Sequence, residues 1–211
     1  MEILQNYING KWVDCISGKT SDNINPADKS EIICRFQSSG VEDANTALEA
    51  AEAAFDGWRK TPVPERAALL LKVIRRMMEL EDEFARAITL ENGKTLRESH
   101  AEFAAAIKEA DYQIGQGRRL GGVYVPSEQP GVSCYLNRQP LGVATLITPW
   151  NFPLNVACRK GFPALIAGNT CVIKPADFTP MSSWLLVRTM HEVGIPAGVV
   201  NYITGRGSVI G

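Results

Sequence analysis

"LITPWNFPLNVACRK", residues 146–160, decides how the fold of this chain is predicted. An apolar run ends at Thr148, and two prolines, Pro149 and Pro153, then flank the tripeptide Trp-Asn-Phe before a helical pattern begins. Each proline fixes its own φ angle and pushes the residue before it toward extended geometry. The prolines therefore predict a stiff loop between a strand and a helix, and they raise the question of what this loop holds in place.

The stretch 141–211 repeats that pattern of strand, loop and helix. Three strand patterns, "LGVATLIT", "NTCVIKP" and "GVVNYIT", alternate with two helical patterns that end at Gly168 and Gly194. This alternation predicts an α/β fold with a parallel sheet and right-handed crossovers. Ligands bind such sheets beyond the carboxyl ends of the strands, so the loops "TPWNFP", "KPADFTP" and "TGRGSVIG" are expected to form the site.

Residues 1–120 are predicted to form short strands followed by a layer of helices. Asn9-Gly10 is a turn signal between two strands, and "EIICRF" is a further strand pattern. A capping box of Ser39 and Glu42 is expected to start the first helix.

A second helical stretch is expected over residues 64–92, with a break near Leu80, and a third over 95–115. Helical spacing predicts that the last of these buries Phe103, Ile107 and Tyr112.

Residues 121–140 form a different kind of segment, with two extended stretches and prolines at 126, 130 and 140. Because proline lacks a backbone N–H, such an arm is expected at a sheet edge or outside the main body. The residues alone leave two interpretations open, an arm that pairs with another subunit and a plain surface hairpin.

Composition excludes several classes of function. The 211 residues carry a formal net charge of -1 with 45% hydrophobic residues, which is typical of a globular protein and not of a nucleic-acid-binding one. No apolar stretch is long enough to cross a membrane and no secretory signal is recognisable, so a cytoplasmic location is expected. The five widely spaced cysteines predict neither a metal site nor a disulfide framework.

The third loop carries a glycine run, Gly205, Gly207 and Gly211. Such a run is found in dinucleotide-binding loops, but the usual fingerprint follows the first strand of its unit and not the third. The alternative is that these glycines serve only a tight turn.

In the second loop, Lys174 ends a strand and Asp177 follows three residues later. A lysine and a carboxylate in this place can hydrogen-bond a ribose diol, and the acid favours the free 2′-hydroxyl of NAD over the 2′-phosphate of NADP. The alternative is that Lys174 is a solvated strand end and Asp177 a helix cap.

In the first loop, Asn151 has two interpretations. It is either a turn residue between two core aromatics, Trp150 and Phe152, or a donor whose amide N–H groups face a pocket. Oxyanion stabilisation needs a neutral donor that is held rigidly where charge develops, and the flanking prolines favour that rigidity.

Taken together, the motifs closely resemble the aldehyde dehydrogenase superfamily. The matching stretches are "INGKW", "NPAD", "TPWNFP", "PALIAGNTCVIKPADFTP" and "GIPAGVVNYITG", in family order from about residue 6 to the end. The resemblance implies a variant Rossmann cofactor domain, with residues 1–120 and 141–211 as its parts and residues 121–140 as an oligomerisation arm, and hence a homodimer or homotetramer.

The resemblance also implies roles for single residues. Asn151 matches the oxyanion donor, and Lys160 matches a lysine assigned to charge relay, with a solvated helix lysine as the alternative. The positions expected to bind NAD, with NADP as the alternative cofactor because Asp177 replaces the more usual Glu, are Thr148, Pro149, Trp150, Lys174, Pro175, Ala176, Asp177, Gly207 and Gly211.

The family oxidises an aldehyde to a carboxylic acid through a cysteine thiohemiacetal, with a glutamate as general base. The motifs that carry this cysteine and glutamate do not occur in the 211 residues, so the chain is expected to correspond to the N-terminal portion of such an enzyme, without its catalytic domain. The alternative is a non-catalytic fragment. Within the family, "GQGRRLGGVYVPSEQP" and "LITPWNFP" most resemble enzymes of short semialdehydes such as 2-oxoglutarate or succinate semialdehyde.

Overall fold

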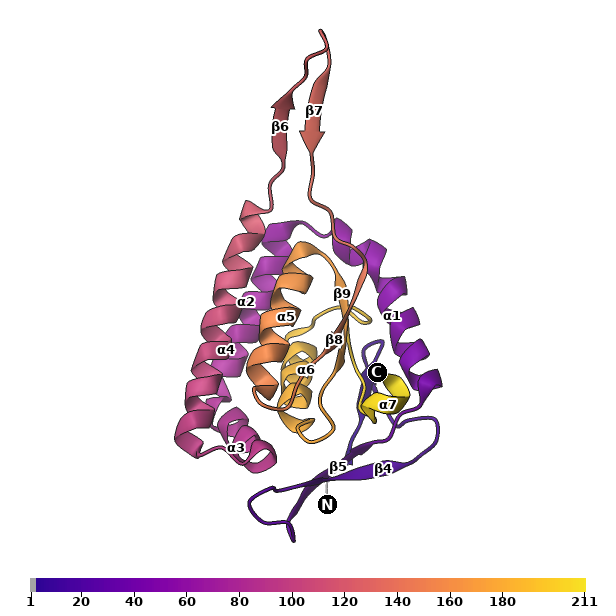
Figure 1. The fold of residues 1–211 in the computed structure, drawn as a ribbon, viewed down its shortest axis with the longest axis vertical. Coiled ribbons are helices and arrows are strands. Elements are labelled where there is room, and N and C mark those ends of the chain that lie inside the picture. The colour runs from indigo at the N-terminus through magenta and orange to yellow at the C-terminus, as the bar shows by residue number, and fades with distance from the viewer. Residues whose placement is uncertain (1–2) are drawn as a thin grey trace.

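A five-stranded sheet forms the centre of the computed structural model, which describes residues 3–211 (Figure 1). Its strand order is β3-β2-β10-β9-β8, and β8, β9 and β10 run parallel, as predicted. The short N-terminal hairpin joins the same sheet because β2 pairs antiparallel with β10. The strand bounds are Asn6–Ile8 (β2), Lys11–Val13 (β3), Val143–Ile147 (β8), Thr170–Lys174 (β9) and Val200–Tyr202 (β10).

A second, smaller sheet lies at one end of the body, next to the carboxyl ends of the parallel strands (Figure 1). It has the order β1-β5-β4, with β1 at Ile3–Leu4, β4 at Thr20–Ile24 and β5 at Ile32–Gln37.

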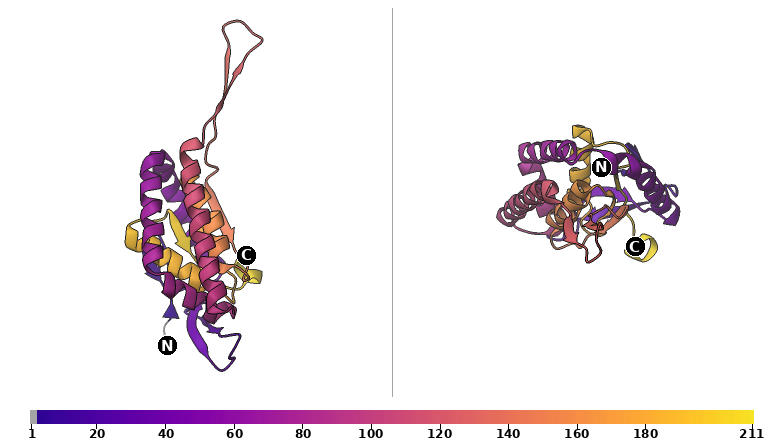
Figure 2. Two further views of the ribbon diagram at one scale, coloured as in Figure 1. Left: turned by 90° about the vertical axis from the view of Figure 1, so that its left-hand side faces the viewer. Right: turned by 90° about the horizontal axis from the view of Figure 1, so that it is seen from above.

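Helices cover both faces of the central sheet (Figures 1 and 2). Helix α1 packs on one face, α5 and α6 pack on the other, and α2, α3 and α4 form a further layer outside α5 and α6. The bounds are Val41–Lys60 (α1), Val63–Glu79 (α2), Glu81–Asn92 (α3), Leu96–Gln116 (α4), Pro153–Ala167 (α5), Met181–Val193 (α6) and Gly207–Ile210 (α7), with a 3-10 turn, η1, at Gly117–Arg119. Among the described residues, no helix has the length and apolar character that a membrane span requires.

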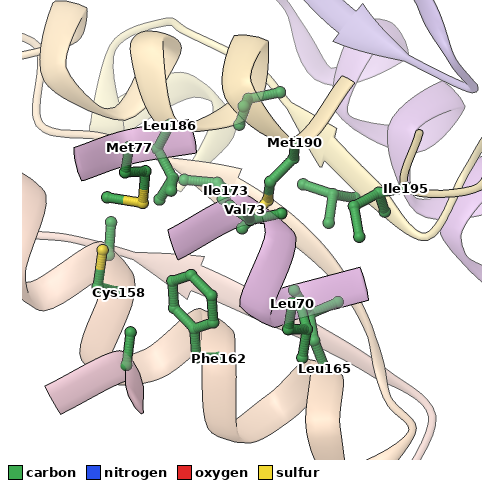
Figure 3. Packing of buried hydrophobic residues seen from close by; sticks show 14 of the residues in the cluster. Leu70, Val73, Met77, Cys158, Phe162, Leu165, Ile173, Leu186, Met190 and Ile195 are labelled. Atoms are coloured by element: carbon green, nitrogen blue, oxygen red, sulfur yellow. The ribbon is translucent and has the colours of Figure 1, made fainter. Parts of the chain in front are cut away.

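The main hydrophobic core lies between the sheet and the two helical layers beside it. Figure 3 shows side chains of α2, α5 and α6 meeting over Ile173 of β9. The labelled residues of these helices are all buried: Leu70, Val73, Met77, Cys158, Phe162, Leu165, Leu186 and Met190. The repeated strand and helix pattern of residues 141–211 therefore packs against the helices of the first half and forms one core with them.

The arm is a two-stranded hairpin that extends away from the body (Figures 1 and 2). Its strands are β6 at Val123–Pro126 and β7 at Ser133–Leu136, and all their residues are exposed. Tyr124 and Tyr135 form a cross-strand pair with ring centroids 5.3 Å apart. The arm leaves the body where β8 begins, at the end opposite to the loops that follow the parallel strands.

Two local predictions were wrong. The N-cap of α1 is Gly40, whose N–H donates to Asp43, because Ser39 is already engaged in a tertiary contact with Asn6. Tyr112 is 61% exposed because it lies on the opposite side of α4 from the buried Ala110 and Ile114, each two residues away at about 100° per residue.

Gly198 offers a test of how closely α1 packs on the sheet. Its φ is +79°, and an added Cβ would lie 2.7 Å from the Ala50 carbonyl oxygen in α1. Gly194 has a similar φ of +88° with open space around it. We expect Gly194→Ala to cost about 1–2 kcal/mol of unfolding free energy from backbone strain alone, and Gly198→Ala to cost about 1–3 kcal/mol more because α1 must move. Urea unfolding of both variants measures the difference, and equal costs would contradict the close packing.

Candidate functional site

The three loops begin at the same level of the sheet because of the strand register. Ile147 lies beside Lys174, and Ile173 lies beside Tyr202. The ladder continues one residue further, where the Thr148 N–H donates to the Lys174 carbonyl at 3.1 Å. The predicted gathering of the loops at one edge is therefore confirmed.

The first loop presents its aromatic residues to the surface. Trp150 and Phe152 are both exposed, so the interpretation of these residues as core aromatics is wrong. Asn151 is exposed as well, and its side-chain amide has no hydrogen-bond partner anywhere in residues 3–211. Thr148 is buried, with a hydroxyl oxygen that has no protein partner in the described chain. The loop thus offers a free amide donor and a free hydroxyl.

The backbone of this loop is held by the turn between α3 and α4. The Asn92 side-chain Nδ2 donates to the Trp150 carbonyl at 2.7 Å, and the Lys94 Nζ donates to the Asn151 carbonyl at 2.6 Å. We call Asn92 and Lys94 the loop clip. Its presence means that the prolines are not the only source of rigidity here.

A buried carboxylate of α4 fixes the start of α5. Glu102, whose side chain is 1% exposed, accepts from the N–H groups of Leu154 and Asn155 at 3.1 and 3.2 Å. Its other oxygen pairs with Lys94 at 2.5 Å. The first turn of a helix has unpaired N–H groups and a positive dipole end, so a carboxylate is well placed there.

A second buried carboxylate does the same for α6. Glu91, at the end of α3, accepts from the N–H groups of Met181 at 2.6 Å and Ser182 at 2.9 Å. Burial raises the pKa of Glu91 from its ordinary 4.5 to about 7, against the lowering effect of hydrogen bonds from Ser182, Met181 and Asn23.

In the second loop, the alternative interpretations of Lys174 and Asp177 are wrong. Lys174 is 4% exposed and is not a solvated strand end; its Nζ donates to the Pro175 carbonyl at 2.7 Å and pairs with Asp177 at 3.0 Å. Asp177 does not cap α6, because Glu91 fills that position. Ala176 closes a turn by accepting from the Thr179 N–H at 3.1 Å. The loop therefore holds a buried ammonium beside a partly exposed carboxylate.

A hollow of about 380 Å³ lies between the second and third loops, lined by Asp177, Phe178, Arg206, Gly207 and Ser208 together with residues of β4 and β5. The third loop is fixed at its start by Asn6, which accepts from the Thr204 N–H at 3.1 Å. Gly205 has a φ of +155°, and a Cβ there would lie 2.9 Å from the Ser39 carbonyl oxygen, so only glycine fits.

Other candidates lie apart from these groups. Lys160 is exposed on α5, seven residues after Pro153 and hence about 10 Å along the helix from its start. Gly211 follows the single turn of α7. Neither residue forms a hydrogen bond with Asn151 in the described part of the chain.

None of the cysteines is placed as a nucleophile next to Asn151. Cys15, Cys34, Cys158 and Cys171 are buried, and Cys134 is exposed on the arm. Burial raises the pKa of Cys158 far above the ordinary range and that of Cys171 to about 12. These two thiols are therefore protonated at neutral pH and unreactive.

Sequence reasoning missed the residues that hold the loops. These are Asn6, Glu91, Asn92, Lys94 and Glu102. A signal for the two glutamates was present, because Glu91 and Glu102 continue the apolar stripes of α3 and α4, where a charged residue needs a partner.

Known proteins resemble this chain over nearly its whole length. The family model described as "Aldehyde dehydrogenase family" matches residues 12–211. An alpha-ketoglutarate semialdehyde dehydrogenase of Haloferax volcanii is 40% identical over 98% of this chain and 43% of its own length. The NADP(+) succinate-semialdehyde dehydrogenase of Escherichia coli is 38% identical over 98% of this chain and 43% of its own.

Among solved structures, PnpE in complex with nicotinamide adenine dinucleotide superposes with a TM-score of 0.94 at 38% identity, covering 98% of this chain and 42% of that one. The likeness confirms the predicted fold. The chain spans about two-fifths of the length of the relatives it matches.

Glu91→Gln tests the buried acid that caps α6. Because the native carboxyl titrates at about pH 7 and an unfolded one near 4.5, the folded protein binds the proton more tightly between these values. The stabilisation of the folded state by protonated Glu91 is complete below about pH 4.5 and is lost as pH rises through about 7.

The wild-type free energy of unfolding should therefore fall relative to that of Glu91→Gln by up to about 3 kcal/mol across this window. Urea unfolding at several pH values between about 5 and 8 measures the difference. A wild-type free energy of unfolding that stays constant or rises with pH, relative to that of Glu91→Gln, would contradict the raised pKa of Glu91.

Proposed function

This chain belongs to the aldehyde dehydrogenase family, and on that basis we propose that it forms the dinucleotide-binding and oxyanion-stabilising part of an enzyme that oxidises an aldehyde to a carboxylic acid. The observation that carries the proposal is the Asn151 amide, which is exposed and unpartnered on a backbone held at two consecutive carbonyls. A free donor on a fixed backbone is what oxyanion stabilisation requires.

In this proposal, Asn151 donates to the aldehyde oxygen as the carbonyl carbon becomes tetrahedral and the oxygen gains negative charge. Such a donor is most effective when water is excluded. Ile147, Trp150 and Phe152, close to Asn151 in the sequence, are exposed apolar residues, and we expect other parts of the whole protein to cover them and enclose the amide.

The second and third loops are proposed to bind the cofactor, a nicotinamide dinucleotide, which when bound supplies a hydride acceptor. The fit is supported by the Lys174–Asp177 pair beside the hollow and by the unpartnered Thr148 hydroxyl at the start of the first loop. Lys174 and Asp177 would hold the ribose, with Pro175 and Ala176 shaping the turn. Thr148, Pro149 and Trp150 would line the nicotinamide end, and Gly207 and Gly211 the phosphate and adenine end.

The reaction also needs a thiolate nucleophile and a general base. The cysteines of this chain are buried or on the arm, and the glutamate motif of the family does not occur in it, so we assign both roles to residues outside 1–211. We accordingly expect the 211-residue chain alone to show no aldehyde-dependent reduction of NAD.

The substrate class is proposed from the relatives. Several are named as semialdehyde dehydrogenases, and a short semialdehyde with a distal carboxylate is therefore the proposed substrate. For assembly, we propose a homodimer or homotetramer, which the exposed hairpin arm supports.

The test of the substrate class is an assay of the whole protein with 2-oxoglutarate and succinate semialdehydes against an uncharged aldehyde of equal length. No preference for the charged substrates would refute the substrate class, and no turnover of any aldehyde would refute the function.

Asn151→Ala in the whole protein should lower kcat by roughly 10²- to 10³-fold, because one oxyanion donor is removed. The dissociation constant for NAD should change little, since the side chain is assigned to the aldehyde and not to the cofactor. Steady-state kinetics and a binding titration measure the two quantities. An unchanged kcat would make Asn151 a turn residue only.

Asp177→Asn should shift the cofactor preference from NAD toward NADP. Loss of a charge-assisted hydrogen bond to the ribose predicts a fall of roughly 10-fold or more in the NAD to NADP ratio of kcat/KM. Asp22→Asn is the matched control, because Asp22 lines the same hollow and also pairs with a cation, Arg35, but is not assigned to the ribose. The same NAD to NADP ratio of kcat/KM in both variants would exclude a specific role for Asp177 in binding the ribose.

A further inference from the structure

We propose that Lys94, together with Asn92, is a positioning residue for the oxyanion donor Asn151. The inference rests on the proposed role of Asn151 and extends it to the turn between α3 and α4. The carbonyls that the loop clip holds belong to the peptide groups on either side of the Asn151 Cα, at 2.7 Å from Asn92 and 2.6 Å from Lys94.

These two contacts restrict the direction of the Asn151 side chain. A peptide group is planar, so a hydrogen bond to its carbonyl oxygen limits how the whole group can turn. With the peptide groups before and after the Cα both restrained, φ and ψ of Asn151 are confined to narrower ranges, and so is the direction of its Cα–Cβ bond. The two contacts do not restrain the side-chain torsions.

The prolines of the loop leave the backbone torsions φ and ψ of Asn151 unconstrained. Pro149 fixes its own φ, and Pro153 fixes its own φ and restricts Phe152. Neither acts on φ or ψ of Asn151. The rigidity that the sequence pattern indicates is therefore completed by residues more than 50 positions earlier in the chain.

Lys94 is itself held from several sides. Its side chain is 18% exposed, its ammonium pairs with Glu102 at 2.5 Å, and it lies 4.0 Å from the centroid of the Phe152 ring. Glu102 in turn binds the first N–H groups of α5. One ammonium thus connects the Asn151 carbonyl to the start of the helix that follows the loop.

The kinetic test uses Lys94→Met, which keeps the length of the side chain and removes its charge. In the whole protein we expect kcat to fall roughly 10- to 100-fold, as for a small displacement of a reacting geometry, with KM for the aldehyde nearly unchanged. If Lys94 acts through Asn151, the double variant Lys94→Met/Asn151→Ala should be no slower than Asn151→Ala alone. Losses that multiply would overturn the inference.

Asn92→Ala provides a second route, because it releases only the Trp150 carbonyl and leaves the Lys94–Glu102 pair in place. It carries the test if Lys94→Met does not fold, and its loss of kcat should likewise vanish in the Asn151→Ala background. Lys108→Met, at an exposed lysine of α4, is the matched control and should match the wild type.

A structural readout does not depend on turnover. In the 15N-labelled 211-residue chain, the heteronuclear NOE of the Asn151 backbone amide should fall in Lys94→Met and Asn92→Ala and stay unchanged in Lys108→Met. An unchanged NOE in both clip variants would overturn the inference.

The two proposals fail in different ways. If Asn151→Ala leaves kcat unchanged, the oxyanion role is wrong and the positioning role falls with it. If Asn151→Ala lowers kcat while both clip variants retain the wild-type value, the function stands and the positioning role is wrong.

Discussion

Two buried carboxylates determine where the crossover helices begin, and the candidate site depends on them. Glu102 binds the first N–H groups of α5, and Glu91 binds those of α6. Neither helix has a capping side chain of its own, since α5 follows Phe152 and α6 follows Pro180. The helix starts are therefore set by tertiary contacts from the outer helical layer, and this layer and the sheet cannot shift independently.

The two carboxylates differ in how their charge is compensated in the protein interior. Glu102 has a cation, Lys94, which also binds the first loop, whereas no cation pairs with Glu91 among the described residues. An unpaired buried carboxyl favours its protonated form, which accounts for the direction of its pKa shift. Both carboxylates fix the helix start that follows a loop, and the Lys94–Glu102 pair also holds the first loop at the Asn151 carbonyl.

The fold was largely predictable because its signals are local. Alternating strand and helix patterns and left-handed glycines at helix ends gave the parallel unit and the C-caps at Gly168 and Gly194. The site was predictable only in part. Asn151, Lys174 and Asp177 stand at strand ends, where position alone indicates a ligand. The residues that hold the loops come from distant helices: Glu102 lies 52 positions from Leu154, and no short window of sequence contains both.

The arm has a thermodynamic consequence for assembly. Within residues 3–211, its two strands are hydrogen-bonded only to each other, and every residue of both is exposed. A two-stranded hairpin without a covering surface is marginally stable in water. In the proposed homo-oligomer, the surface that receives the arm would supply the free energy that orders these residues, so docking and hairpin formation would become a single coupled equilibrium. Dilution that separates the subunits would then also melt the arm.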